Sequence, residues 1–395
     1  MQAIAQTRTM QPFDFQLRPR IIFGEGVVAR LGELARQIGG KRALLVSDSG
    51  VVDAGHFDTG RRYLESAGLQ VESFHDFQEN PDTNMVQAGV AVARRFQPDI
   101  LIGLGGGSSI DCCKGINFVY SCGGAMRDYR GVGKATADML PMIAVPTTAG
   151  TGSESQSFAL ISDADSHVKM ACGDPRAACR VALLDPILTI TQPGTVTALT
   201  GIDALSHAVE TYVTKPRNAI SVTFSRRAFG LLAMGFPKVL REPDNLEARS
   251  RMQIGACLAG LAIETSMLGA AHALGNPLTA RFNVVHGQAV GVMLPHVVRL
   301  NGQRFANWYA ELLSEIEPVI APEQAPQRMA DLLTDYLRQA KLATDLASLS
   351  VPESAFDQLV EDAGEQWTGT FNPVELNPTT LRGLYAAALH DRDVP

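Results

Sequence analysis

The sequence predicts a two-part fold: an α/β amino-terminal domain with a mostly parallel, Rossmann-like sheet, and an all-helical carboxy-terminal domain. In the first half, short apolar runs alternate with helical patterns, and this rhythm is typical of a parallel sheet covered by helices on both faces. The apolar runs include residues 43–47, 100–103 and 142–145, and the helical patterns include residues 26–38, 53–67 and 83–96. After about residue 188 long helical patterns follow with almost no strand signal. We therefore expect one domain over residues 1–190 and a second over residues 191–395.

Composition narrows the classes of partner and compartment. The 395 residues are 46% hydrophobic and 19% charged, which is ordinary for a globular protein. A net charge of −7 without a basic stripe disfavours nucleic acid as a partner. The first ten residues lack the apolar core of a signal peptide, and the uncharged stretch 254–263 is shorter than the ~20 residues of a membrane span. Six cysteines without a C-x-x-C pair predict reduced thiols in a cytoplasm.

A glycine-rich loop follows the apolar run that begins at residue 100. It reads Gly103-Leu-Gly-Gly-Gly-Ser-Ser-Ile-Asp111 and opens a helical pattern. Glycines let the backbone approach a phosphate, and a helix amino terminus offers unpaired N–H groups and a partial positive charge. The loop thus predicts a phosphate site. Its composition is also explained by turn geometry alone, and Asp111 by a favourable first-turn charge.

A second loop, Pro146-Thr-Thr-Ala-Gly-Thr-Gly-Ser-Glu154, follows the apolar run at residue 142. Its hydroxyl-rich surface, including Thr147, Thr148 and Ser153, suits a ribose or a nicotinamide amide. A flexible turn is the alternative, but two such loops at successive strand ends favour one shared ligand.

The carboxylate of Asp48 follows the run at residues 43–47. A carboxylate at this place accepts hydrogen bonds from an adenosine ribose and repels a 2′-phosphate, which favours NAD over NADP. Asp48-Ser-Gly50 is equally good turn chemistry.

Four residues of the helical half form a candidate metal-ligand set. Asp203 and His207 are four residues apart on one helical face. His272 is expected near the end of a helix that Pro277 breaks, and His286 opens the next apolar run. One carboxylate and three imidazoles suit Fe²⁺, Mn²⁺ or Zn²⁺ without selecting among them. Singly, each histidine is explained as a core residue and the aspartate as a helix cap.

Taken together, these motifs resemble the iron-containing alcohol dehydrogenase family of the dehydroquinate-synthase-like superfamily. They occur in order over essentially the whole chain, with further matches at residues 23–26 and at Asn80-Pro81. The resemblance implies a dinucleotide-binding domain, a helical metal-binding domain, and a metal in the cleft between them. It implies Fe²⁺ and NAD as cofactors, an alcohol or its aldehyde or ketone as substrate, and a homodimer or larger homo-oligomer.

The family's functional residues can be placed on this chain one by one. The resemblance makes Asp203, His207, His272 and His286 the metal ligands and the active centre. It assigns the nucleotide to Asp48, Asn80, Gly105, Gly106, Gly107, Ser108, Asp111, Thr147, Thr148, Ser153 and Lys169.

Asn276 departs from the family pattern, in which a histidine often stands four residues after the third ligand. Asparagine cannot take up a proton near neutral pH, so we expect protons to leave through water and ribose hydroxyls. The expected reaction is hydride transfer between an alcohol and NAD(H), with the metal as Lewis acid on the alcohol oxygen. The alternatives are a zinc-dependent polyol dehydrogenase of the glycerol type, a cyclising lyase of the same fold, and an inactive relative that binds metal or nucleotide.

Overall fold

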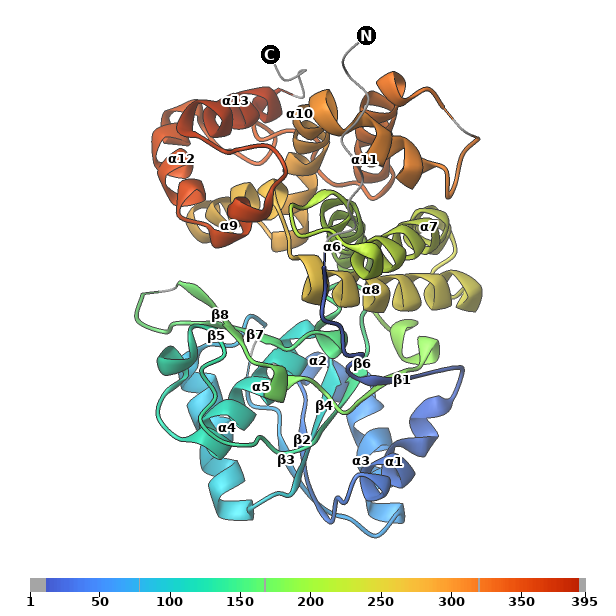
Figure 1. Cartoon of the computed structure of the whole chain (residues 1–395). Coiled ribbons are helices and arrows are strands. Elements are labelled where there is room, and N and C mark those ends of the chain that lie inside the picture. Colours follow the sequence, from blue (N-terminus) through green and yellow to red (C-terminus); the bar gives the residue numbers. More distant parts are fainter. Residues whose placement is uncertain (1–11, 78, 167, 319, 391–395) are drawn as a thin grey trace.

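A six-stranded parallel sheet forms the centre of the amino-terminal half (Figure 1). The computed structural model describes residues 12–77, 79–166, 168–318 and 320–390. The strand order is β1-β9-β6-β4-β2-β3, and every neighbouring pair is parallel. The strands are β1 (Arg20–Phe23), β2 (Arg42–Val46), β3 (Gln70–Phe74), β4 (Ile100–Gly105), β6 (Met142–Pro146) and β9 (Val181–Leu184).

Both faces of this sheet are buried, as its continuous apolar runs predict. Successive residues of β2 alternate between the two cores: Leu44 and Val46 join one cluster, whereas Ala43 and Leu45 join the other. Helices α4 and α5 cover the first face, and α1 and α3 cover the second (Figure 1). The helices of this half are α1 (Leu31–Gln37), α2 (Ser49–Asp53), α3 (His56–Ser66), α4 (Thr83–Phe96) and α5 (Gly107–Cys122).

A second, three-stranded sheet lies between the parallel sheet and the helical half (Figure 1). Its order is β5-β8-β7, with β7 antiparallel to β8. The strands are β5 (Gly131–Val132), β7 (Phe158–Ser162) and β8 (Lys169–Gly173). The sequence rhythm did not predict this sheet, because its strands are short and only partly buried.

The carboxy-terminal half is helical, and its helices share one large apolar core. All strands of the described residues lie before Asp185, so the predicted fold class is confirmed. The helices are α6 (Gly194–Val213), α7 (Ala219–Arg241), α8 (Leu246–Ser266), α9 (Ala270–Phe282), α10 (His286–Leu313), α11 (Ala325–Gln339), α12 (Phe356–Gly364) and α13 (Pro378–Leu389).

The expected helix break at Pro277 is wrong. Helix α9 continues through Pro277 to Phe282. Proline removes one backbone donor from the helix, and here packing of α9 against α10 and α12 compensates for that loss. The consequence is that His272 lies in the first turn of α9 rather than near its end.

Within the described part of the chain, no single helix combines the length and apolar composition of a membrane span. Helices α8 and α9, bent by 105° at their junction, meet both criteria only as a pair.

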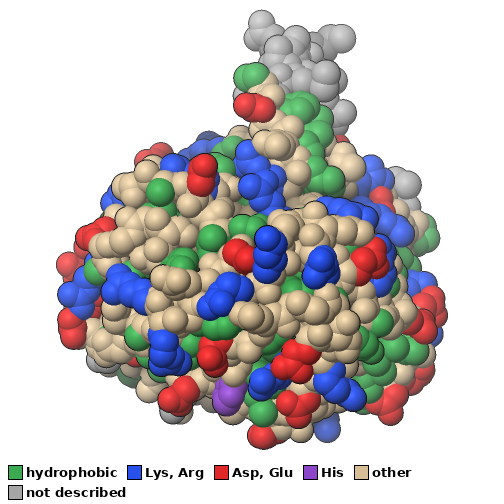
Figure 2. All heavy atoms as spheres, turned by 90° about the horizontal axis from the view of Figure 1, so that it is seen from below, with side chains coloured by type: hydrophobic (Ala, Val, Ile, Leu, Met, Phe, Trp, Pro, Cys, Tyr) green, Lys and Arg blue, Asp and Glu red, His purple; other side chains and the backbone are tan. Residues whose placement is uncertain are grey.

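Figure 2 shows the lower face of the molecule, where Lys and Arg side chains are intermixed with Asp and Glu.

Helix α8 joins the two halves by packing its backbone directly on the threonine-rich loop. A Cβ atom on Gly260 would lie 2.3 Å from the Ser155 hydroxyl and 2.5 Å from the Gly152 carbonyl oxygen. Gly152 itself has a φ of 63°, which is in the left-handed region. Further along the same seam, the Ser155 hydroxyl donates to the Cys257 carbonyl at 2.8 Å. The halves are therefore held at a fixed separation beside this loop.

This seam predicts that Gly260→Ala destabilises the protein by about 1–3 kcal/mol, because the added methyl group has no room. Gly383→Ala is the matched control, since Gly383 lies in helix α13 with nothing within 4 Å of its would-be Cβ. Denaturant unfolding measures both variants, and we expect the control to be neutral or slightly stabilised. Equal stability of the two variants would contradict the seam.

Candidate metal centre and nucleotide loops

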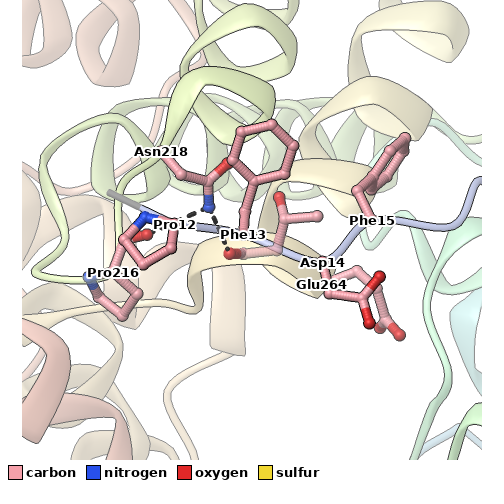
Figure 3. Close-up of a pocket in the computed structure, with 8 residues that line it drawn as sticks. Pro12, Phe13, Asp14, Phe15, Pro216, Asn218 and Glu264 are labelled. Atoms are coloured by element: carbon pink, nitrogen blue, oxygen red, sulfur yellow. Dashed lines mark hydrogen bonds between the residues drawn. The ribbon is translucent and has the colours of Figure 1, made fainter. Parts of the chain in front are cut away.

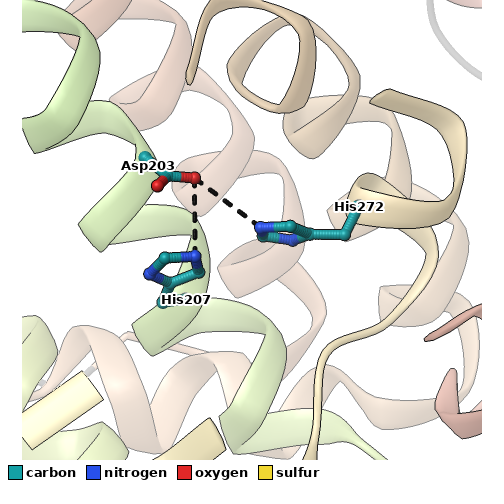
Figure 4. A group of neighbouring side chains, drawn as sticks. All are labelled: Asp203, His207 and His272. Atoms are coloured by element: carbon teal, nitrogen blue, oxygen red, sulfur yellow. Dashed lines mark ion pairs between the residues drawn. The ribbon is translucent and has the colours of Figure 1, made fainter. Parts of the chain in front are cut away.

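Three imidazole rings converge on one carboxylate oxygen in the helical half. Figure 4 shows two of them, His207 and His272, with Asp203. The Nε2 atoms of His207, His272 and His286 lie 3.4, 3.6 and 3.7 Å from Oδ1 of Asp203. Asp203 and His207 come from α6, whereas His272 comes from α9 and His286 is the first residue of α10. The structure thus brings together all four residues that the sequence selected, from three helices.

The donor atoms fit a divalent metal ion. Oδ1 of Asp203 and Nε2 of His272 are buried without a hydrogen-bond partner. Ligand atoms about 2.1 Å from a metal in tetrahedral arrangement lie about 3.4 Å apart, close to the separations seen here. Asp203, His207 and His272 form a buried group whose ligand atoms all lie within 4.8 Å of one another. Two unpartnered buried atoms at ligand spacing are what a metal would satisfy.

The electrostatic surroundings shift the pKa values of the three histidines in different directions. Burial lowers the pKa of His286 to about 3, and the positive charge of Lys169 acts in the same direction. Burial also lowers the pKa of His207. Burial alone would raise the pKa of Asp203, but the surrounding histidines outweigh it and hold that pKa well below its usual range. Two neutral imidazoles and one carboxylate are the protonation states that bind metals.

Glu210 contacts the remaining histidine, His272, at the ring nitrogen that does not face Asp203. Its carboxylate accepts a hydrogen bond from the Ala271 backbone N–H at 2.6 Å and contacts Nδ1 of His272. Burial lowers the pKa of His272, but Glu210 and Asp203 outweigh it and raise that pKa to about 9. A proton on Nδ1 leaves Nε2 as the ligand atom, so Glu210 fixes both ring orientation and tautomer. Sequence reasoning missed this role, although Glu210 lies on α6 seven residues after Asp203.

Close packing between helices fixes the position of His286. A Cβ atom on Gly287 would lie 2.2 Å from the Leu199 carbonyl oxygen, so the first turn of α10 lies against α6. The His286 side chain is 28% exposed, whereas those of His207 and His272 are 6% and 4% exposed. His286 is therefore the candidate ligand on the open side of the cluster.

The two predicted nucleotide loops lie side by side at the carboxyl edge of the parallel sheet. Strands β4 and β6 are neighbours, and Gly105 pairs with Pro146. Would-be Cβ atoms on Gly106 and Gly107 would lie 3.3 Å from Thr148 and 2.6 Å from Thr151. The glycine loop opens α5, whose first residue is Gly107. The loops therefore form one continuous surface around a helix amino terminus, a site type that binds phosphate.

The remaining predicted nucleotide residues differ in their surroundings. Asp48 caps α2, accepting from the Val51 N–H at 3.1 Å and from the Ser109 hydroxyl at 2.6 Å. The Asn80 N–H donates to the Ser108 hydroxyl at 3.2 Å, and Lys169 Nζ lies 3.4 Å from Asn80 Oδ1. These residues lie along the edge that carries the glycine loop.

The side chains of three predicted nucleotide residues, Thr147, Asp111 and Ser153, are buried. The Ser153 hydroxyl donates to the Asp111 carboxylate, and the ammonium group of Lys114 binds the same serine. Sequence reasoning did not single out Lys114.

A separate pocket of about 230 Å³ lies outside the metal cluster and both loops (Figure 3). It is formed by the segment at residues 12–15 and the facing ends of α7 and α8, where the Asn218 amide donates to the carbonyls of Pro216 and Thr265. Among the described residues, its lining includes no histidine, lysine or arginine.

Comparison with known proteins identifies the family. Residues 18–186 match the family model described as iron-containing alcohol dehydrogenase, and residues 197–389 match the carboxy-terminal model of the Fe-containing alcohol dehydrogenase family. The chain belongs to the iron-containing alcohol dehydrogenase family and is an alcohol oxidoreductase.

Two relatives and one solved structure match this chain over nearly its full length. The chain is 33% identical over 382 residues to 1,3-propanediol dehydrogenase of Klebsiella pneumoniae, covering 95% of this chain and 98% of the relative. It is 34% identical over 364 residues to NAD-dependent methanol dehydrogenase of Bacillus methanolicus, covering 91% and 95%. A crystal structure of 1,3-propanediol oxidoreductase superposes with a TM-score of 0.93 at 32% identity, covering 96% of this chain and all of the other.

The contact of Glu210 with His272 predicts that Glu210→Gln weakens divalent-metal binding about 10- to 100-fold, because the imidazole loses its orienting carboxylate. Competition between the protein and a chelator for Zn²⁺ measures the affinity. Glu264→Gln is the control, because Glu264 contacts Ser157 and none of the four ligands. Unchanged metal affinity in the Glu210 variant, with the fold intact, would contradict this role.

Proposed function

We propose that this protein catalyses reversible hydride transfer between a small alcohol and NAD, with Fe²⁺ held by Asp203, His207, His272 and His286. The convergence of three imidazole nitrogens on one unpartnered carboxylate oxygen is the observation that carries the proposal. Iron is favoured over Zn²⁺ or Mn²⁺ by the family, since the ligand set accepts all three. When bound, such a metal supplies Lewis-acid chemistry, which lowers the pKa of an alcohol.

The residues of the chain divide the remaining work among binding, orientation and proton management. We propose that the N–H groups at the start of α5 bind the pyrophosphate, that Asp48 binds the adenosine ribose, and that Thr148 faces the nicotinamide end. Lys169 and Asn80 complete this surface. The charges of both Asp111 and Asp203 act on Lys169, which supports a role for Lys169 close to both the nucleotide loops and the metal ligands. A nucleotide on this edge would direct its nicotinamide toward the cluster.

NAD is favoured over NADP because Asp48 follows β2 at this edge and would repel a 2′-phosphate. The printed name of the methanol dehydrogenase relative is also NAD-dependent. The zinc-dependent polyol alternative has no support in the comparisons, and the complete ligand set disfavours an inactive relative.

Three wider assignments accompany this function. We propose domains at residues 1–190 and 191–395, which agrees with the interval between the two family matches. We propose a cytoplasmic location, since the six cysteines are free thiols. We also propose a homodimer or larger homo-oligomer, and sedimentation of the purified protein tests this oligomeric state. Neither nucleic acid nor a membrane is proposed as a partner.

The direct test is NADH absorbance during incubation with methanol, ethanol or 1,3-propanediol, using protein loaded with Fe²⁺ under anaerobic conditions. We expect turnover with at least one alcohol and its loss after chelation, with recovery when Fe²⁺ is restored. Full activity in the chelated protein would contradict a metal-dependent reaction.

His286→Ala should abolish metal retention and lower turnover by about a thousandfold or more. The metal would lose one of its four proposed ligands, the one on the open side of the cluster. NADH binding should persist, since His286 lies on α10 and not on the nucleotide edge. The exposed His390 supplies the control variant His390→Ala. Metal content and turnover are measured on both, and a fully active, metal-free His286 variant would refute the ligand assignment.

Asn276→His tests proton management. Asn276 lies one helical turn after His272 on α9, and its amide donates to Gln366 Oε1 at 3.0 Å. An asparagine here cannot exchange protons, whereas a histidine introduces a group that titrates near neutral pH. We expect a new ionisation between about pH 6 and 7 in the pH–rate profile of the variant. An unchanged profile would show that position 276 lies outside the proton path.

A further inference from the structure

Lys114 is a fully buried lysine in the second turn of α5, the helix whose amino terminus borders the nucleotide loops. Its ammonium group, with three N–H donors, lies within hydrogen-bond distance of four oxygens, none of which belongs to a carboxylate. The acceptors are the Ser153 carbonyl at 2.7 Å, the Ser153 hydroxyl at 3.2 Å, the Gln156 carbonyl at 2.7 Å and the Phe158 carbonyl at 2.8 Å. All four belong to one segment, residues 153–158.

Asp111 holds the same segment from one turn earlier on α5. Its carboxylate accepts from the Ser153 hydroxyl and from the Leu160 backbone N–H, the latter at 3.2 Å. Burial raises the pKa of Asp111, and the charge of Lys114 opposes this shift. The two side chains therefore bond one segment, residues 153–160, which leads into and begins β7, and their opposite charges attract each other without direct contact.

The fixed segment determines the position of Thr151, which lies on the nucleotide surface. The Ser153 N–H donates to the Thr151 hydroxyl at 3.2 Å, and the Gln156 amide donates to the Thr151 carbonyl at 2.7 Å. Thr151 in turn packs on Gly107, the first residue of α5. A chain of contacts thus runs from Lys114 through residues 153–156 to the phosphate-binding end of its own helix.

Packing alone does not explain a charged group at this position. Burying an ammonium ion is expensive, and an apolar side chain of similar length fills a helix position without that desolvation. A point charge with three donors offers something that an apolar side chain lacks, namely simultaneous bonds to several backbone carbonyls. That ability is what a loop of fixed shape requires.

We propose that Lys114, together with Asp111, is a positioning residue for the dinucleotide: it fixes the threonine-rich loop against the start of α5, so that both loops present one preorganised surface. This inference rests on the proposed NAD site. It also gives Asp111 and Ser153 a role beneath the nucleotide surface in place of direct contact with the nucleotide.

The test compares Lys114→Met with Asn117→Leu. Asn117 is a buried polar residue one turn further along α5 that bonds the backbone of Leu140, away from the nucleotide loops. We expect Lys114→Met to weaken NADH binding about tenfold or more, measured by fluorescence titration of the metal-loaded protein. The KM for NAD should rise by a similar factor, with a smaller change in kcat and unchanged Zn²⁺ affinity. Asn117→Leu should lower thermal stability while leaving NADH affinity unchanged.

A second variant keeps the inference testable if Lys114→Met does not fold. Gln156→Leu removes the bond to the Thr151 carbonyl while the bonds of Lys114 and Asp111 to the segment stay in place, and NADH binding should weaken about threefold. Wild-type affinity for NADH in a folded Lys114 or Gln156 variant would overturn the positioning role. Failure of the wild-type protein to bind NADH would instead overturn the proposed function, so the two failures are distinguishable.

Discussion

The approach of helix α8 to the threonine-rich loop is the constraint on which the rest of the structure depends. Gly152 and Gly260 bring two backbones together with no room for a side chain between them. The same loop touches α6, because a Cβ atom on Gly150 would lie 2.5 Å from the Thr200 side chain, three residues before Asp203. The predicted nucleotide loop therefore also packs against α6, the helix that carries Asp203 and His207.

This shared loop explains how two modest features combine into one active centre. The parallel sheet presents glycines and hydroxyls at one edge, and the helical half presents a carboxylate surrounded by imidazoles. Neither feature performs hydride transfer alone, since the reaction needs the carbinol carbon of the alcohol within reach of the nicotinamide ring. Helix α5 contacts the loop through Lys114, and α6 and α8 pack against it. These contacts fix the distance between the sheet edge and the imidazole cluster.

Sequence patterns predicted the parts of the structure that depend on local chemistry. The alternation of apolar runs and helices gave the parallel sheet, and the four-residue spacing of Asp203 and His207 gave one shared face. The patterns failed where distant contacts decide. Helix α9 continues through Pro277 because neighbouring helices hold it, and Glu210 meets His272 across 62 residues of sequence. Lys114 was missed for the same reason, since its acceptors lie 39 to 44 residues away.

The most direct test of the account is anomalous diffraction at the iron edge from crystals grown anaerobically with Fe²⁺ and NAD. The account predicts one strong peak at bonding distance, about 2.0–2.2 Å, from Asp203 and the Nε2 atoms of His207, His272 and His286. The nicotinamide ring should lie in the cleft beside that peak. A peak outside this cluster, or none in protein that oxidises alcohols, would contradict the central claim.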